Sequence, residues 1–300
     1  MSRRIVVVGD VVTDVIVRPH SAIIHGTDTA SSIAIIAGGS AANTAAWIGA
    51  LGGTVEFVGR AGRDQHAWHE GLLNQFGVHA LITADPELPS ARIVVIVDAS
   101  GERTMLTDRG ANDALSLADV ECARIDSKTM LHVSGYTLLF DGPRPAGLSA
   151  LQRARREGAP TSVDPNSSGF LANVGPTRFL EMTANVDICF PNADELCALI
   201  GGTDPFEAAI ALTHHYGTVV CKLGPEGAVV ARAGAIVARR RAPDVTVIDT
   251  TGAGDAFAAG YLAALANGRN VDGCLDLAIE TSGRAVSTVG ARPAEVHTAR

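Results

Sequence analysis

The sequence predicts an α/β fold with a mainly parallel central sheet, helices on both faces of that sheet, and a small additional β-sheet. Short β-rich runs alternate with helical patterns through most of the 300 residues, which is the order of elements that a parallel sheet requires. Further β-like runs lie outside this alternation. The chain also contains 32 glycines, above the usual share of roughly 7%, and this excess suits a fold with many tight turns.

The alternating elements follow one another in a regular order. The predicted strands of the central sheet are residues 5–8, 55–58, 130–133, 161–163, 186–190 and 218–222. Helical patterns lie near residues 41–51, 66–76, 145–157, 194–200 and 205–216. Ligands of such folds bind outside the carboxyl ends of the strands. We therefore expect the polar and glycine-rich segments that follow these strands to form a site together.

Four β-like runs break the alternation, at residues 11–17, 31–36, 91–97 and 104–107. The first continues the opening strand past Asp10, and the last two flank residues 98–102, which have the composition of a hairpin turn. Together they predict a small sheet that forms a lid on a single domain of residues 1–300, contributed by about residues 11–37 and 90–110. Near the end of the chain, residues 228–231 and 236–240 are expected to pair as antiparallel strands.

Composition excludes several kinds of partner. The formal net charge of −8 argues against a general basic surface for nucleic acid. No uncharged apolar stretch of about 18 residues is present, so no transmembrane helix is expected. The five cysteines are odd in number and widely separated, which is typical of reduced core residues rather than of disulfides or a metal site. We expect a cytoplasmic protein with a small-molecule partner and with no nucleic-acid or membrane partner.

The most informative segment is residues 249–255, with the sequence Asp-Thr-Thr-Gly-Ala-Gly-Asp. The β-branched residues 245–248 before it predict a strand, and the Ala- and Leu-rich residues 256–266 after it predict a helix. The first amides of a helix have no internal partner, so the small residues 252–254 suit a closely bound anion. Asp255 beside that anion can accept a proton from a hydroxyl that attacks phosphorus. From this segment alone, a helix cap explains Asp255 equally well.

Four other segments carry polar or glycine-rich signals near predicted strands. They are Asp14, the segment 38–43 with Gly38, Gly39 and Asn43, the segment 192–195 with Asn192 and Glu195, and the segment 222–227 with Lys222, Gly224 and Gly227. The sequence has no Gly-x-x-x-x-Gly-Lys-Ser/Thr loop and no complete Gly-x-Gly-x-x-Gly after the first strand. The chain is therefore neither a simple P-loop enzyme nor an evident Rossmann dehydrogenase.

The order and spacing of these segments resemble the ribokinase or PfkB-type carbohydrate kinases over essentially the whole chain. The family's Gly-Gly-x-x-x-Asn signature, Asn-x-x-Glu motif, nucleotide-side glycine turn and Asp-Thr-x-Gly-Ala-Gly-Asp signature match residues 38–43, 192–195, 224–227 and 249–255. Each motif alone is common, but the four in this order are specific. The resemblance implies a ribokinase-like fold and an ATP-dependent kinase that phosphorylates a hydroxyl, expected to be primary, of a small sugar.

The resemblance assigns the chemistry to the C-terminal signature. It implies that Asp255 is the general base, and that the amides of Gly252, Ala253 and Gly254 stabilise the charge on the transferring phosphoryl group. A carboxylate is too weak a base to ionise an alcohol beforehand, so the proton is transferred in the transition state.

The resemblance also implies a substrate set formed by Asp14, Gly38, Gly39 and Asn43. A carboxylate accepts hydroxyl hydrogen bonds, an amide side chain both donates and accepts them, and a glycine lets a sugar ring approach the backbone. Arg109 falls where the lid meets the pocket. It either contacts an acidic group of the substrate or is a surface arginine.

The nucleotide side is implied at Lys222, Gly224, Gly227, Thr250 and Gly254, although the turn at 224–227 needs glycine in any case. The pair Asn192 and Glu195 resembles a motif that organises Mg²⁺ through water. The same pair also has the spacing of a capping box, and both explanations can hold. Asp164-Pro165-Asn166 also follows a strand and either faces the same water network or forms a plain turn.

Two further expectations rest on the family. Asp249 and Thr251, with residues 287–292, resemble the loop pair that holds a monovalent cation such as K⁺ in some members. Family lids often pair into dimers, and residues 31–36 offer an edge strand for a homodimer.

Three alternatives stay open. A nucleoside kinase of the same family needs a base-stacking subsite, but aromatic residues make up only 4% of the chain and few lie in the predicted lid, which favours a sugar. A 2-keto-3-deoxy sugar acid fits if Arg109 enters the pocket. A protein of another class would be a non-catalytic sugar sensor with a kinase fold.

Overall fold

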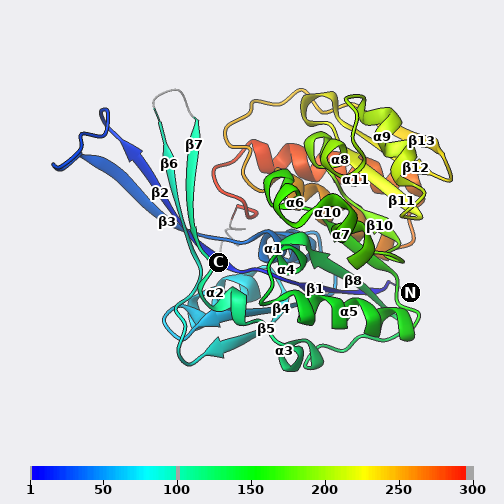
Figure 1. Cartoon of the computed structure of the whole chain (residues 1–300), viewed down its shortest axis with the longest axis horizontal. Coiled ribbons are helices and arrows are strands. Elements are labelled where there is room, and N and C mark those ends of the chain that lie inside the picture. Colours follow the sequence, from blue (N-terminus) through cyan, green and yellow to red (C-terminus); the bar gives the residue numbers. More distant parts are fainter. Residues whose placement is uncertain (1, 99–101, 295–300) are drawn as a thin grey trace, which may run out of the picture.

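The computed structural model describes residues 2–98 and 102–294 and contains two sheets (Figure 1). The larger sheet is formed by β1 (Arg4–Val8), β4 (Val55–Gly62), β5 (Val78–Asp85), β8 (Thr129–Ser134), β9 (Thr161–Asp164), β10 (Ile188–Cys189), β11 (Thr218–Lys222), β12 (Ala228–Arg232) and β13 (Ala235–Arg240). Its strand order is β13-β12-β11-β10-β9-β8-β1-β4-β5, and all neighbours from β11 to β5 are parallel. The predicted pair at 228–231 and 236–240 is confirmed as the antiparallel strands β12 and β13.

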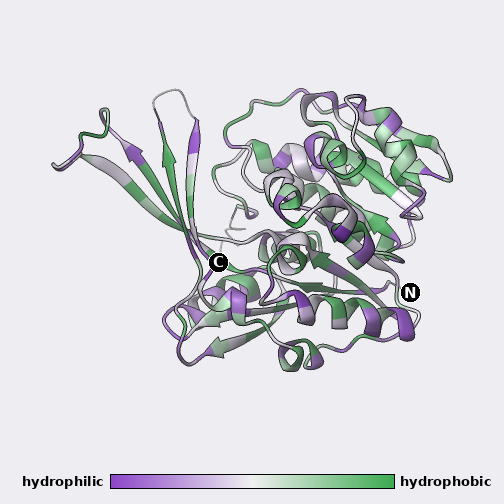
Figure 2. Ribbon diagram, viewed as in Figure 1, coloured by the Kyte–Doolittle hydropathy of each residue, from purple (hydrophilic) through white to green (hydrophobic). Residues whose placement is uncertain are grey.

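Helices cover both faces of the larger sheet. One face is covered by α1 (Ser40–Ala50), α2 (His66–Gln75), α10 (Ala253–Ala266) and α11 (Val271–Val286). The other face is covered by α3 (Leu117–Glu121), α4 (Gly135–Leu139), α5 (Arg144–Arg156), α6 (Ser168–Val174), α7 (Pro176–Met182), α8 (Ala193–Ile200) and α9 (Pro205–Leu212). Strand β1 shows how the two cores form, because Ile5 and Val7 belong to the first and Val6 and Val8 to the second. Figure 2 shows these central strands as hydrophobic along their length.

The second sheet, called the small sheet below, projects from the main body (Figure 1). It is formed by β2 (Val12–Pro19), β3 (Ser31–Gly38), β6 (Arg92–Val97) and β7 (Arg103–Asp108) in the order β3-β2-β6-β7. Strands β2 and β6 are parallel, and both outer pairs are antiparallel. The predicted β6–β7 hairpin is confirmed, although residues 99–101 of its turn lie outside the described residues. The predicted fold class, including the small extra sheet, is confirmed.

Several predicted elements differ from the structure. Residues 11–17 do not continue the first strand, because β1 ends at Val8 and β2 pairs in the other sheet. The central strand predicted at 186–190 is only Ile188–Cys189, and the helix predicted at 205–216 ends at Leu212. Sequence reasoning also missed β5, the short helices α3, α4, α6 and α7, and the long helix α11.

The strand predicted at 245–248 is wrong. These residues run exposed along the end of α11, where the Ile248 amide donates to the carbonyl of Val286 at 2.7 Å. Strand β13 ends at Arg240, and residues 245–248 pair with no strand of either sheet. β-Branched residues favour an extended backbone, but a strand also needs a neighbour to pair with.

All five cysteines are free, and Cys189, Cys221 and Cys274 are buried as predicted, whereas Cys122 is exposed. Within the described ranges, no helix combines the length and the apolar character that a bilayer span requires.

Candidate active site

A cavity of about 600 Å³ lies between the small sheet and the loops at the carboxyl ends of the central strands. Eight of the predicted site residues line it, namely Asp14, Gly39, Asn43, Arg109, Asp249, Thr251, Gly252 and Asp255. The early and late signatures, which are about 200 residues apart in the sequence, therefore meet in one cavity. Gly38 lies at its edge, where an added Cβ would overlap the carboxylate of Asp14.

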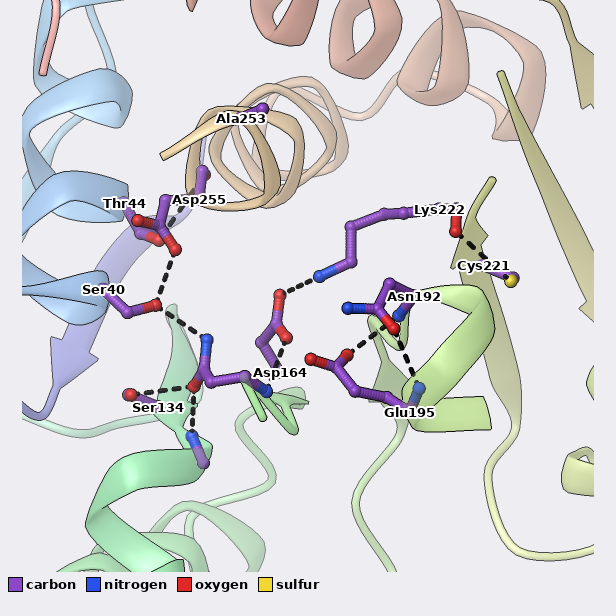
Figure 3. Close-up of polar contacts among 12 residues, drawn as sticks. Ser40, Thr44, Ser134, Asp164, Asn192, Glu195, Cys221, Lys222, Ala253 and Asp255 are labelled. Carbon is purple, nitrogen blue, oxygen red and sulfur yellow. Dashed lines mark hydrogen bonds and ion pairs between the residues drawn. The ribbon is translucent and has the colours of Figure 1, made fainter. Parts of the chain in front are cut away.

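Asp255 projects from the first turn of α10 toward the first turn of α1 (Figure 3). Its Oδ1 accepts a hydrogen bond from the hydroxyl of Ser40 at 2.6 Å, and its Oδ2 accepts one from Nδ2 of Asn43 at 3.0 Å. The Ser40 hydroxyl in turn accepts a hydrogen bond from Nδ2 of Asn166 at 2.7 Å. The carboxylate is therefore held by another helix and does not cap its own, which removes the helix-cap explanation.

Burial raises the pKa of Asp255 to about 7. The hydrogen bonds from Ser40 and Asn43 act in the opposite direction, and the negative charges of Asp164 and Asp10 add to the rise. A carboxylate with this pKa is a stronger base than an exposed one and is still ionised in a large fraction of molecules at neutral pH. These properties suit proton acceptance from a hydroxyl group.

The start of α10 offers free backbone amides. Gly252 precedes the helix in a left-handed conformation with φ of 74°, and a Cβ there would lie 2.6 Å from the Cβ of Ala291. No side chain caps the helix. The Ala253 amide donates to the carbonyl of Thr250 at 3.3 Å, so this predicted anion donor already has an acceptor. The next amides, of Gly254 and Asp255, have no acceptor within the helix and suit an anion.

Asp14 lies in β2 and faces a buried positive charge. Burial raises its pKa to about 7, the charge of Arg292 acts against this rise, and Asp10 adds to it. Arg292 donates to the carbonyl of Gly38 at 3.0 Å and to Oδ1 of Asn43 at 3.3 Å. Sequence reasoning named residues 287–292 only for a cation and missed this contact with the predicted substrate set.

Arg109 borders the cavity but is already engaged. Its guanidinium lies 3.6 Å from the centre of the Phe140 ring, and its Nε donates to Asp113 at 2.6 Å. Another arginine, Arg103 of β7, was not predicted. It forms an ion pair with Asp249 at 2.7 Å and donates to the hydroxyl of Thr251, so the small sheet contacts the segment that precedes α10.

Asp249 supports its own loop. Its Oδ1 accepts hydrogen bonds from the Thr251 amide at 2.9 Å and the Thr251 hydroxyl at 2.6 Å, and its Oδ2 accepts one from the Gly290 amide at 3.1 Å. Burial would raise the pKa of Asp249, but these hydrogen bonds and the charge of Arg103 outweigh it and lower the pKa. The structure thus joins the two loops predicted to hold a cation, without testing the cation itself.

A second buried charge cluster lies beside the start of α10 (Figure 3). Nζ of Lys222 pairs with Oδ2 of Asp164 at 2.5 Å, and a Cβ on Gly254 would lie 3.4 Å from the same Nζ. Burial disfavours the charged lysine, but the neighbouring Asp164 and Glu195 outweigh burial and raise the pKa of Lys222. Burial raises the pKa of Glu195 to about 7, against the charge of Lys222.

Asn192 and Glu195 form the predicted capping box of α8, with two hydrogen bonds of 2.8 Å. The carboxylates of Glu195 and Asp164 and the amide oxygen of Asn192 are the oxygen donors that Mg²⁺ prefers. Among the described residues, no group of three His, Cys, Asp or Glu side chains could hold a metal directly. The residues therefore fit Mg²⁺ bound through water, and this role stays a prediction.

The other predicted nucleotide residues lie outside the cavity. Gly224 and Gly227 belong to the turn between β11 and β12, where the Leu223 amide donates to the Gly227 carbonyl at 2.8 Å. Gly224 and Thr250 are exposed.

Aromatic side chains line the cavity from an unexpected side. Tyr136 of α4, Phe140 at its end and Phe170 of α6 all border the cavity. The Tyr136 and Phe170 ring centres are 6.2 Å apart, and those of Phe140 and Phe170 are 4.8 Å apart. Sequence reasoning looked for aromatic residues in the lid, whereas these belong to two short helices that it did not predict.

Comparisons with known proteins agree with this fold and these motifs. A family model described as pfkB family carbohydrate kinase matches residues 2–298. A ribokinase from Arabidopsis thaliana is 30% identical over 302 residues, which cover 96% of this chain and 77% of that protein. Solved structures of a probable sugar kinase protein from Rhizobium etli CFN 42 and of an adenosine kinase from Sinorhizobium meliloti each match with a TM-score of 0.86 and 28% identity, covering 98% of this chain and 96% of theirs.

The fold and these matches define an ATP-dependent carbohydrate kinase with a ribokinase-like fold. The chain belongs to the pfkB family of carbohydrate kinases.

Proposed function

We propose that the protein transfers the γ-phosphoryl group of ATP to a hydroxyl, expected to be primary, of a small sugar or of a sugar within a larger molecule. The observation that carries this proposal is the arrangement of Asp255. Its carboxylate borders the cavity, both of its oxygens are oriented by hydrogen bonds, and it belongs to the same helical turn that offers free amides to an anion. A base and an anion site side by side are what phosphoryl transfer to an alcohol needs.

In this proposal Asp255 accepts the hydroxyl proton as the oxygen attacks phosphorus. The amides at residues 252–254 stabilise the charge on the transferring group, with Gly254 the best placed. Asp14, Gly39 and Asn43 line the same cavity and hold the other sugar hydroxyls. The sugar is thereby oriented so that one hydroxyl meets the base.

The residues proposed to bind the nucleotide lie outside the cavity. The ammonium of Lys222 borders the start of α10, and we propose that it helps to neutralise the phosphates of ATP. Mg²⁺ bound through water by Asn192 and Glu195 would bridge phosphate oxygens and lower their charge. The glycine turn 224–227 and Thr250 would border the remainder of the nucleotide. A K⁺ ion at the loops of Asp249 and Thr251 would make turnover faster in KCl than in NaCl, and equal rates would exclude it.

We propose that the small sheet acts as the lid and pairs with a second copy of the chain. On β3, Ala34 and Ile36 line the cavity, whereas Ile33 and Ile35 on the opposite face are 65% and 62% exposed. A second sheet would cover this apolar face. Sedimentation velocity should therefore show a dimer that Ile35→Asp dissociates, and a monomeric wild type would exclude the pairing.

The substrate class is narrowed by charge. Among the described residues that line the cavity, five aspartates face three arginines. Arg103 and Arg109 are also already paired with Asp249 and Asp113. This balance disfavours a 2-keto-3-deoxy sugar acid and favours a neutral acceptor. Relatives named ribokinase and adenosine kinase show that a free sugar and a nucleoside both remain candidates.

Asp255→Asn tests the proposal. The amide cannot accept the proton, and loss of general-base catalysis typically costs about 10²–10⁴ in rate, so turnover should fall by at least about 100-fold. Asp272→Asn, an exposed change on α11, is the matched control and should leave turnover unchanged. An effect of Asp255→Asn below about tenfold would exclude the base role. Absence of ATP-dependent phosphorylation across sugars and nucleosides would instead favour the non-catalytic sugar sensor.

A further inference from the structure

Three rings form a continuous row along one wall of the cavity, and we call Tyr136, Phe170 and Phe140 the aromatic row. The row begins beside the catalytic network, because the Tyr136 hydroxyl donates to the carbonyl of Asn166 at 3.4 Å. It ends at the guanidinium of Arg109, which lies against Phe140. The aromatic row thus leads away from the position of the reacting hydroxyl, toward the foot of the small sheet.

The wall of the cavity that the small sheet forms is mainly apolar, although Arg18 and Arg103 of this sheet also line it. It is formed by side chains of the small sheet, which include Ile16, Ile36, Ile93, Val95, Val97 and Met105. The polar groups suited to sugar hydroxyls, Asp14, Asn43 and Asp255, belong to the other end, around the start of α1 and α10. A second sugar ring between these walls would leave the hydroxyls that face aromatic and aliphatic side chains without partners, which costs free energy. A flat apolar ring loses nothing there and stacks on the aromatic faces.

The lining of the cavity also contains polar side chains outside the set proposed for the sugar. Thr107 and Asp108 precede Arg109 in the chain, and both line the cavity with Ser167. Their hydroxyl and carboxylate groups can form hydrogen bonds with ring nitrogens and exocyclic amines at the edge of a heteroaromatic ring.

We propose that the acceptor is a nucleoside, a neutral sugar that carries a flat heteroaromatic base stacked between the aromatic row and the small sheet. This inference rests on the proposed phosphoryl transfer and names its substrate class. The cavity of about 600 Å³ is within the size range of pockets that enclose a ligand of two joined rings.

Phe170 is the residue to vary, because it contacts both other rings of the row. Phe170→Leu keeps an apolar side chain of similar size but removes the ring, and Phe170→Tyr restores the ring. The matched control is Phe206→Leu on α9, since Phe206, like Phe170, packs against the second core but lies outside the cavity. Binding of adenosine, uridine and D-ribose is measured calorimetrically, and kcat/KM is measured for the same compounds with ATP.

We expect the wild type to bind adenosine or uridine at least tenfold more tightly than ribose. Phe170→Leu should weaken nucleoside binding by about 5-fold to 150-fold, the range for losing one base-stacking contact. Phe170→Tyr and Phe206→Leu should each stay within about threefold of the wild type. The inference is overturned if neither nucleoside binds more tightly than ribose, or if Phe170→Leu and Phe206→Leu weaken binding equally. If nucleosides bind in this way but no compound is phosphorylated, the proposed kinase function is contradicted, whereas the nucleoside subsite is supported.

Discussion

In the proposed reaction Asp255 is the general base, and the hydrogen bond from the Ser40 hydroxyl lowers its pKa against the effect of burial; Ser40→Ala isolates this contribution. The substitution removes the 2.6 Å hydrogen bond to Oδ1 of Asp255 but keeps the Ser40 amide, which donates to Asp10 at 2.7 Å and orders the start of α1. A hydrogen bond to a charged group is worth about 1.5–3 kcal/mol, and one pKa unit corresponds to about 1.4 kcal/mol. The pKa of Asp255 should therefore rise by about 1–2 units from its value of about 7.

This shift has a specific signature in the pH dependence of the reaction. At pH 7 about half of the wild-type Asp255 is ionised, whereas the variant should be ionised in about 1–10% of molecules. We therefore expect kcat/KM at pH 7 to fall by about 5-fold to 50-fold, and the acid limb of the profile to move up by about 1–2 pH units. The activities of variant and wild type should converge at high pH, because both carboxylates are then ionised.

The assay is kcat/KM between pH 5 and 10 with saturating ATP and a neutral acceptor. Thr44→Val is the matched control, because the Thr44 hydroxyl contacts only the backbone carbonyl of Asp255, at 3.5 Å, and not its carboxylate. In Thr44→Val, the acid limb of the kcat/KM profile should lie at the same pH as in the wild type. A limb that stays in place in Ser40→Ala, or a loss of activity that is equal at every pH, would refute the assignment of the limb to Asp255.

Two further predictions concern the buried charge cluster. Lys222→Met removes the positive charge beside Asp164 and Glu195, so the free energy of unfolding at pH 8 should drop by about 3–5 kcal/mol and partly recover at pH 5, where Glu195, with its pKa of about 7, is protonated. Urea unfolding at both pH values tests this, with the exposed Lys128→Met as control, and a loss independent of pH would contradict it. Glu195→Gln should raise the Mg²⁺ concentration for half-maximal turnover by about tenfold or more, as loss of an outer-sphere carboxylate does, and an unchanged Mg²⁺ titration would exclude this role. In the unliganded wild type, the free energy of unfolding should fall between pH 5 and pH 8. This fall should be smaller in Glu195→Gln.

The parts of the site that depend on local sequence could be predicted, and those that depend on packing could not. The small residues at 252–254 identified the start of α10 because a helix terminus is encoded by a few neighbouring residues. The partners of Asp255 could not be assigned in the same way. Ser40 was part of a recognised motif without a role, and it meets Asp255 only because α1 and α10 pack together.

The same reason explains the missed aromatic wall. Helices α4 and α6 span five and seven residues, which is too short for a clear apolar period. Composition was informative about the total number of aromatic residues but not about their positions. Three rings on two such helices are enough to change the substrate class that the cavity favours, so a count over the whole chain is weak evidence about a site.

The three buried acids of the site depend on the two hydrophobic cores that surround them. Burial raises the pKa values of Asp14, Glu195 and Asp255 to about 7, well above their values in an unfolded chain. The folded protein therefore holds more protons than the unfolded chain at mildly acidic pH, and its stability falls as the pH rises toward 7. At neutral pH each ionised acid is an unfavourable buried charge, which hydrogen bonds and neighbouring positive charges offset only in part, and the packing of the surrounding elements keeps it in place. Hydroxyl donors of an acceptor and cations beside the phosphates favour the ionised forms, so binding should return stability at the residues that the reaction uses.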